Sequence, residues 1–161
     1  MESKTFKDVL SHWASGVTVI TTLHEGTPIG VTASAFNSVS LEPPLVLICL
    51  AKKLFTHKVI ENAGVFAVNI LANEQADLGQ RFAGLHPRVT DRFEGLKTTT
   101  FETGCPILPN VAGWADCRVQ HSYDGGDHTI FVGEVLAGGA QDNYAPLLYF
   151  HRMWGRFEEL L

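Results

Sequence analysis

Small hydroxyl and apolar side chains alternate in the stretch TASAFNSVS, residues 32–40, which runs almost directly into the apolar segment LVLICL, residues 45–50. Four of its side chains are small hydroxyls, those of Thr32, Ser34, Ser38 and Ser40. Burying hydroxyls beside a core strand costs free energy unless each finds a hydrogen-bond partner. Short side chains also let a planar heteroaromatic ligand approach the backbone N–H groups. We interpret the stretch as ligand-binding, although a single Ser or Thr more often bonds to nearby backbone.

Two further sites have residue types that suit ligand binding. In GDHTIFVGEV, residues 126–135, His128 follows a turn, and a histidine at a hairpin rim can stack on a ligand or donate to it. An isolated histidine in this place is more often an ordinary strand-end side chain. Arg81 and Phe82 form the third candidate, where the alternative is a solvated arginine beside a core phenylalanine, unless an anion lies nearby.

Several familiar catalytic and nucleotide-binding patterns are absent from the sequence. It contains neither G-x-G-x-x-G nor G-x-x-x-x-G-K-[ST], so a nucleotide would have to be held by another device. No two of the seven histidines stand at i and i+4 with a carboxylate between them, which disfavours a zinc hydrolase. No G-x-S-x-G elbow is present either. We therefore expect no metal, and a hydrolytic triad has little support.

Composition indicates a compact chain without a nucleic-acid surface. Of the 161 residues, 45% are hydrophobic and 18% charged, which is typical of one globular domain. The net charge of −5 provides no basic field for DNA, RNA or an anionic membrane.

The cysteines and the N-terminal segment indicate the cellular compartment of the protein. Cys49, Cys105 and Cys117 are far apart and odd in number, which predicts free thiols in a reducing environment. The first residues lack the charged and then apolar regions of a signal peptide, and no apolar stretch is long enough to span a bilayer. We expect a soluble, cytoplasmic protein.

The N-terminal third predicts a helix followed by strands. Four apolar residues at helical spacing before Gly16 predict a surface helix over residues 5–15 with one stripe packed inward, namely Phe6, Val9, Leu10 and Trp13. VTVITTL and PIGVTASAF flank Glu25-Gly26 and predict a hairpin. LVLICL follows Pro43-Pro44 as a third strand.

The remainder predicts more strands, short helices and one long loop. Thr56 could cap a helix through Asn62 that ends at Gly64, before the two-sided buried strand VFAVNIL. Residues 73–84 have a helical pattern, and residues 85–111, which we call the excursion, should run over the surface. DGGD predicts a hairpin turn between two long strands, and PLLYF and WGRFEEL are further strands. Six or seven strands joined by turns favour an antiparallel barrel or sandwich.

Taken in order, these fragments resemble a known family. GVTVITT, GVTASAFNSVSLEPPLVL, VFAVNIL, QRFAG, GDHTIFVGEV and PLLYF are similar to the short-chain flavin reductases, the reductase components of two-component flavin monooxygenases, over nearly the whole chain. The resemblance implies a single domain over residues 1–161, a mainly β, antiparallel Greek-key split barrel of the FMN-binding type with a few peripheral helices. It also implies a homodimer that reduces FMN or FAD with NADH or NADPH and supplies reduced flavin to a separate oxygenase.

The resemblance assigns roles to residues of this chain. Most of the implied contacts surround the flavin ring, and they come from Thr32, Ala33, Ser34, Ala35, Ser38, Cys49, Leu50 and Ala51. Thr56 would help to hold the flavin phosphate, with charge from Lys53. Arg81 and Phe82 would lie near the flavin tail or the nicotinamide pocket. The nicotinamide would contact His128, assisted by Tyr149. Hydride passes between the two cofactors, so no side chain is needed as an acid or base.

Two departures from the family pattern affect this assignment. AKKLFTHK has lysines where relatives usually have serines ahead of the phosphate-binding Thr, so Lys52 or Lys53 would supply charge in place of hydroxyls. Ala35 replaces a common serine and removes one donor to the ring. The alternatives are a flavin carrier or electron-transfer module that does not use nicotinamide, and an oxidase or hydrolase on the same barrel. NADH is favoured mildly over NADPH, while FMN and FAD are not distinguished.

Overall fold

The computed structural model describes residues 1–160, and its main element is one antiparallel sheet. In spatial order, the seven strands of the sheet are β3 (Thr27–Ala33), β2 (Thr18–His24), β6 (Val65–Ile70), β7 (Gly113–Gly125), β8 (His128–Ala140), β5 (Leu45–Ala51) and β4 (Phe36–Ser40). Every neighbouring pair runs antiparallel. The predicted mainly β, antiparallel split barrel is confirmed.

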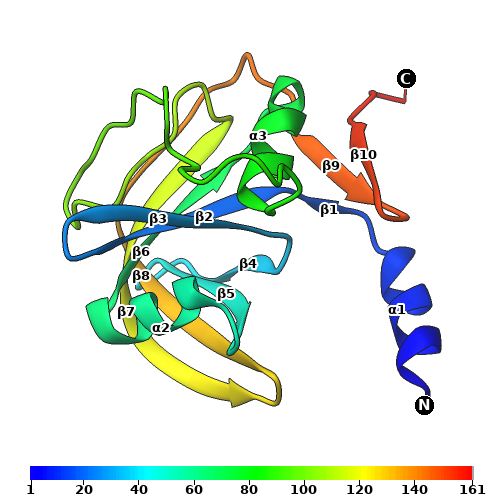
Figure 1. Cartoon of the computed structure of the whole chain (residues 1–161), viewed down its shortest axis with the longest axis horizontal. Coiled ribbons are helices and arrows are strands. Elements are labelled where there is room, and N and C mark those ends of the chain that lie inside the picture. The colour runs from blue at the N-terminus through cyan, green and yellow to red at the C-terminus, as the bar shows by residue number, and fades with distance from the viewer. Residues whose placement is uncertain (161) are drawn as a thin grey trace.

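The two edges of this sheet are consecutive in the chain. β3 is one edge and β4 the other, and only Ser34 and Ala35 separate them. The sheet therefore curls until its edges face each other, as Figure 1 shows where β2–β3 lie across from β4–β5. Within residues 1–160 no ladder joins β3 to β4. We call Ser34, Ala35 and the facing edges of β3 and β4 the seam.

Both faces of the central strands are buried. Val19 lies in one hydrophobic core with Ala67, while the next residue, Ile20, lies in a second core with Phe66 and Val68. Strands buried on both faces read as continuous apolar runs, which explains VTVI and VFAV. The prediction that VFAVNIL is a two-sided strand is confirmed.

The hairpin turns follow their predicted chemistry. Glu25 and Gly26 both have positive φ, 50° and 79°, and connect β2 to β3. Such left-handed pairs match the twist of the flanking strands. Gly126 at φ 81° and Asp127 likewise connect β7 to β8. Both predicted hairpins are confirmed.

Two short helices flank the barrel. α2 (Phe55–Ala63) connects β5 to the non-adjacent β6 and ends at Gly64, which has the left-handed φ of 68° that favours glycine. α3 (Ala76–Phe82) follows the 3-10 turn η1 (Asn73–Gln75). The predicted cap at Thr56 is wrong by two residues, because Leu54 is the N-cap and Thr56 lies inside the first turn. Of residues 1–160, no helix is long and apolar enough to span a membrane.

The N-terminal helix differs from its prediction. α1 (Ser3–Ser11) stands away from the barrel in Figure 1, and none of its residues is buried. The helix ends at Ser11, short of the predicted residue 15, and the apolar stripe formed by its residues and by Trp13 just beyond it is between 52% and 78% exposed at Phe6, Val9, Leu10 and Trp13. The expected inward packing is wrong for this single chain, because its fold offers the stripe no complementary surface.

A second, smaller sheet joins the two ends of the chain. Its order is β1 (Ser15–Gly16), β9 (Leu147–Phe150) and β10 (Met153–Arg156), so the described residues contain more than the six or seven strands expected. The WGRFEEL strand ends earlier than its sequence pattern suggests, at Arg156. This sheet lies beside α3 at the right of Figure 1.

The excursion is only partly a surface loop. Its apolar residues Cys105, Ile107, Leu108 and Val111 are at most 3% exposed and belong to the core that contains Val19. An isolated bridge between Thr99 and Ile107 shapes this segment. The expectation of a wholly surface path is wrong, because these apolar side chains cover the outer face of β2 and β6.

Asn69 attaches the excursion to the barrel. Its Nδ2 donates to the Val19 carbonyl oxygen (3.1 Å) and the Thr21 hydroxyl (3.2 Å), and its Oδ1 accepts from the Leu108 N–H (2.7 Å). The Asn69 side chain is fully buried. One amide therefore satisfies buried polar groups on β2 and on the excursion.

Replacing Asn69 by leucine should destabilise the fold strongly. Asn69→Leu leaves the Leu108 N–H buried without its acceptor and removes a donor from β2, so we expect a loss of about 3 kcal/mol in unfolding free energy. Urea denaturation followed by circular dichroism measures this loss. Asn62→Leu on the exposed face of α2 is the control and should change stability by less than about 0.5 kcal/mol. Equal midpoints for the two variants would contradict the assigned role of Asn69.

Candidate active site

The candidate flavin-ring residues meet at the seam. Thr32 and Ala33 end β3, and Ser34 and Ala35 are exposed as the chain crosses to β4. The Ala35 carbonyl oxygen accepts a hydrogen bond from the Cys49 N–H (3.1 Å), which brings TASAF beside the end of β5. The structure therefore brings together two of the predicted segments, and the edge backbone of β3 faces this place without a ladder partner.

The Thr32 hydroxyl has a protein partner. It donates to the Gly79 carbonyl oxygen of α3 at 2.6 Å, while Thr18 donates to the Ala33 carbonyl oxygen at 2.7 Å. A hydroxyl proton can be donated only once, so Thr32 can meet a ligand only as an acceptor. Its hydrogen bond instead holds α3 against the strand that leads to the seam.

The end of β5 lies against the β7–β8 turn. Ala51 pairs with His128 in the ladder, and the Lys52 N–H donates to the Asp127 carbonyl oxygen at 3.0 Å. Cys49 is half-buried, and this desolvation raises the pKa of its thiol, so Cys49 is a small neutral group and not a thiolate. The Leu50 side chain is 2% exposed in the core, so its expected flavin contact, which stays a prediction, would come from the backbone.

The first turn of α2 suits an anion. No side chain caps this helix at Leu54, and no acidic residue lies in its first turn. Free N–H groups and the helix dipole favour negative charge at such an end. Lys52 forms an ion pair with Asp124 at 3.0 Å. The exposed Lys53 is therefore the lysine ahead of α2 that we expect to bind an anion. Thr56 is only 6% exposed, so its hydroxyl is close to the helix end but largely covered.

Arg81 and Phe82 have mainly structural contacts. Arg81 Nη2 donates to the carbonyl oxygens of Asp91 (3.1 Å) and Glu94 (2.7 Å), which holds the excursion on α3. Phe82 is fully buried and packs edge-to-face on Phe93 with ring centroids 5.0 Å apart. The Phe82 ring belongs to the core, and the expectation that Phe82 lies near the flavin tail or the nicotinamide pocket stays a prediction.

His128 is oriented by its neighbour at the hairpin rim. Its Nδ1 lies 2.7 Å from the Asp127 carboxylate, and this hydrogen bond is the main cause that lowers the pKa of Asp127. The pKa of Asp124 is also lowered, first by the Gly126 N–H and then by Lys52. With Nδ1 as the donor, a neutral imidazole keeps Nε2 as an acceptor. Sequence reasoning missed this role of Asp127, although the GDH string contains it.

Two predicted residues lie away from this group. Tyr149 is on β9 and lines a cleft of about 810 Å³ whose lining includes Ser34 and Ala35 but not His128. Ser38 pairs with Val46, toward the opposite end of β5 from Ala51. A single chain thus does not bring Tyr149 and His128 together.

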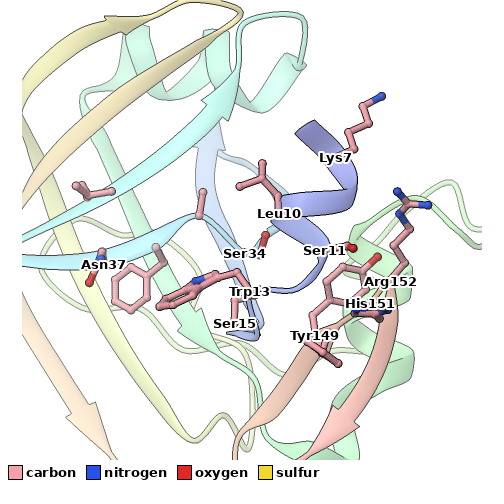
Figure 2. A pocket seen from close by; sticks show the side chains of 14 residues that line it. Lys7, Leu10, Ser11, Trp13, Ser15, Ser34, Asn37, Tyr149, His151 and Arg152 are labelled. Carbon is pink, nitrogen blue, oxygen red and sulfur yellow. The ribbon is translucent and has the colours of Figure 1, made fainter. Parts of the chain in front are cut away.

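The cleft beside Ser34 has an aromatic and cationic lining (Figure 2). It is bounded by α1, the start of β4 and the β9–β10 turn, and Figure 2 shows Lys7, Trp13, Tyr149, His151 and Arg152 around it. None of these except Tyr149 was a candidate from the sequence, because they come from opposite ends of the chain. Their proximity depends on the pairing of β1 with β9.

The described residues show no group of three or more His, Cys, Asp or Glu side chains that could hold a metal. Burial raises the pKa of the Cys117 thiol to about 12, so this cysteine is also a poor ligand or nucleophile. The groups available for ligand binding at the site are accessible backbone, small side chains, the start of α2 and one oriented histidine.

Comparison with known proteins agrees with this arrangement. Residues 10–158 match the family model described as flavin reductase like domain. The chain is 39% identical over 152 residues to the reductase subunit HsaB of a flavin-dependent monooxygenase from Mycobacterium tuberculosis, covering 93% of this chain and 80% of that protein. It is 37% identical over 161 residues to a flavin reductase (NADH) from Kitasatospora aureofaciens, covering 98% and 83%.

A solved structure shows the same architecture. The NADH:FAD oxidoreductase SgcE6 of Streptomyces globisporus, in complex with NAD and FAD fragments, superposes with a TM-score of 0.90 at 32% identity, covering 98% of this chain and 93% of that one. The fold, the length of the match and the level of identity lead to one conclusion. This chain belongs to the flavin reductase like domain family.

Proposed function

We propose that this protein is an NADH-dependent flavin reductase that reduces FMN or FAD, with residues 1–161 acting as one domain. The observation that carries this function is the seam, where an unpaired strand edge and small side chains lie beside the end of β5, the strand that leads through residues 52–54 into the open first turn of α2. A planar ring can lie against the former, and a phosphate suits the latter. The named activities of the relatives support the same reaction.

The residues at the seam fit a flavin. Ser34 and Ala35 are exposed and leave their backbone accessible, with Cys49 and Ala51 half-buried on the neighbouring strand. Lys53 and the free N–H groups at the start of α2 would hold the phosphate. When bound, the flavin supplies the hydride acceptor and NADH the donor, so the protein contributes binding and orientation and needs no acid or base.

His128 would orient the nicotinamide. Asp127 holds its Nδ1, and Ala51 is its partner across the ladder, so the ring stands at the end of β5 next to the proposed flavin contacts. Its Nε2 can accept a hydrogen bond from the carboxamide, or the ring can stack on the nicotinamide. Either contact orients the donor without transfer of a proton.

The reduced flavin would be used by a separate oxygenase. Relatives are named as reductase subunits or components of monooxygenases, which supports a partner of this kind. The seam residues Ser34 and Ala35 are exposed, so a flavin held there can leave without opening of the core.

We further propose that the protein is a homodimer. The exposed stripe of α1 is contiguous and apolar, and such patches on soluble proteins mark interfaces. α1 is not loosely attached, because Arg152 pairs with Asp8 (3.1 Å) and the His151 N–H donates to the Ser11 carbonyl oxygen (2.9 Å). If Tyr149 and His128 contact one nicotinamide, they would do so from two copies of the chain.

Anaerobic stopped-flow absorbance tests the reaction directly. We expect NADH to bleach the oxidised-flavin band rapidly in the presence of the protein, with NADPH slower, because Arg81 near the proposed site is already bonded to backbone carbonyl oxygens and Lys52 to Asp124. FMN and FAD are each tested with both nucleotides. Tight flavin binding without bleaching by either nucleotide would reject the reductase and favour a flavin carrier.

His128→Ala should separate reduction from flavin binding. We expect a loss of about tenfold or more in kcat/KM for NADH, with the flavin Kd changed less than about twofold, because the side chain contacts only the nicotinamide. His121→Ala, an exposed histidine on the same hairpin, is the matched control and should leave both values unchanged. Equal losses in reduction and in flavin binding would show that His128 acts on the flavin site instead.

Charge on the α1 stripe should disrupt the dimer. Sedimentation equilibrium should give twice the chain mass of 17.6 kDa for the wild type and the single-chain mass for the double substitution Leu10→Glu and Trp13→Glu. Both side chains are more than half exposed in the single chain, so its fold should survive, as circular dichroism can check. Lys58→Glu on α2 is the control for added negative charge. A dimeric double variant would place the interface elsewhere.

A further inference from the structure

A buried histidine joins α2 to the inner strand β8. His57, in the first turn of α2, is 4% exposed, and Thr129 on β8 is 7% exposed. The Nε2 atom of His57 lies 2.8 Å from the Thr129 hydroxyl oxygen, and its ring packs on Phe131 with centroids 5.2 Å apart. Thr129 and Phe131 are two residues apart on one strand, so their side chains lie on the same face of β8. The imidazole therefore has a defined position on β8.

The two ends of this hydrogen bond adjoin the two parts of the proposed site. The backbone N–H groups of Phe55, Thr56 and His57 are the first of α2 and have no acceptor inside the helix. Thr129 follows His128, the residue proposed to orient the nicotinamide, and lies in the ladder between β5 and β8. The His57 side chain thus connects the proposed phosphate contacts with the strand that carries His128.

Neighbouring strands fix β8, whereas the first turn of α2 has few directional contacts. β8 lies between β7 and β5 and forms ladders with both. The C-terminal end of α2 is held by the Gly64 carbonyl oxygen, which accepts from the Val119 N–H at 2.8 Å. Apolar side chains such as Ile60 also pack on the sheet, but apolar contacts set no direction. Within residues 1–160, the bond from His57 to Thr129 is the only side-chain hydrogen bond between α2 and the sheet.

Packing alone does not explain a histidine at this place. Its second ring nitrogen, Nδ1, is buried, and within residues 1–160 it has no hydrogen-bond partner. A buried polar atom without a partner costs free energy, and an apolar side chain of similar size would avoid this cost. The one contact that an apolar side chain could not make is the hydrogen bond to Thr129. This bond adds direction, because a hydrogen bond weakens steeply when its angle departs from linearity.

We propose that His57 is a positioning residue, which holds the N–H groups at the start of α2 in a fixed place relative to β8, the strand that carries His128. This inference rests on the proposed function, in which those N–H groups bind the flavin phosphate and His128 orients the nicotinamide. A flavin anchored at α2 then presents its ring to the nicotinamide in one orientation. Hydride transfer needs this alignment, since reacting atoms must lie about 3–3.5 Å apart. Without the bond, the phosphate contacts would shift against the sheet.

Comparing FMN with riboflavin in Thr129→Val tests what the bond positions. The substitution removes the hydroxyl with little change of shape, and riboflavin has the ring of FMN without its phosphate. In fluorescence titrations we expect the wild type to bind FMN more tightly than riboflavin. Thr129→Val should weaken FMN about tenfold and change riboflavin less than about twofold, because only FMN uses the start of α2. Thr129→Ser keeps the hydroxyl and should retain most of the FMN affinity.

A matched control and a double variant separate positioning from stability. Thr22→Val removes another buried hydroxyl, which donates to the Val65 carbonyl oxygen (2.9 Å) beyond the other end of α2, and should leave both flavin affinities unchanged. His57→Leu combined with Thr129→Val replaces the polar pair by apolar side chains, so its urea midpoint should stay close to that of the wild type. Its FMN affinity should nevertheless fall as in Thr129→Val.

Reduction of bound flavin by NADH tests the alignment itself. In anaerobic stopped flow at saturating flavin, Thr129→Val should lower the limiting rate for FMN about tenfold and change the rate for riboflavin and the KM for NADH less than about twofold. Equal losses with FMN and riboflavin, or no loss with either, would overturn the role of His57 even where NADH reduces the flavin. If neither nucleotide reduces the flavin, the reductase is rejected, while FMN-specific weakening in Thr129→Val would still support the positioning of the phosphate contacts.

Discussion

Two residues, Ser34 and Ala35, carry the chain from one edge of the seven-stranded sheet to the other. A connection this short requires the sheet to curl fully, but among residues 1–160 the edges it joins are not paired with each other. Unpaired strand edges carry polar groups that need partners and invite association with other chains. Side-chain packing closes the core of the barrel. The backbone N–H and C=O groups along the seam therefore stay available to a ligand. The small side chains of TASAF follow from the same constraint, because large ones would cover the edge.

Ligand binding alone does not account for the hydroxyl side chains of residues 32–40, because one of them bonds to the protein itself. Thr32 is bonded to α3, and Ser34 is exposed at the seam. The hydrogen bond of Thr32 matters for the site because α3 carries Arg81, which in turn holds residues 91–94. A comparable link holds α2, where His57 Nε2 lies 2.8 Å from the Thr129 hydroxyl, next to His128. Buried polar bonds between side chains thus fix the two helices relative to the strands that end at the site.

Local sequence patterns predicted the strands and turns well, because their physical causes are local. Glu25-Gly26 and Gly126-Asp127 have the conformations that tight hairpins demand, and VFAVNIL has the two-sided burial that its composition indicates. The predictions are wrong where the packing partner of a segment is distant in the sequence. The α1 stripe finds no surface within its own chain, and the apolar part of the excursion is buried only because β2 and β6 lie beneath it. A family resemblance indicates positions but not side-chain directions, and the burial of the Leu50 and Phe82 side chains could not be predicted from it.

A flavin that must be released sets a limit on how the site can be built. Deep burial of a planar ring among apolar side chains would bind it tightly and slow its departure, since affinity differences act mainly on the dissociation rate. Here the proposed ring contacts are exposed or half-buried, and the anion contact is the open end of a helix and not a bidentate arginine. Added affinity would then have to come from the flavin tail, where the free N–H groups at the start of α2 can hold a phosphate without enclosing the ring. A flavin held in this way would keep its ring open to NADH and would leave without opening of the core.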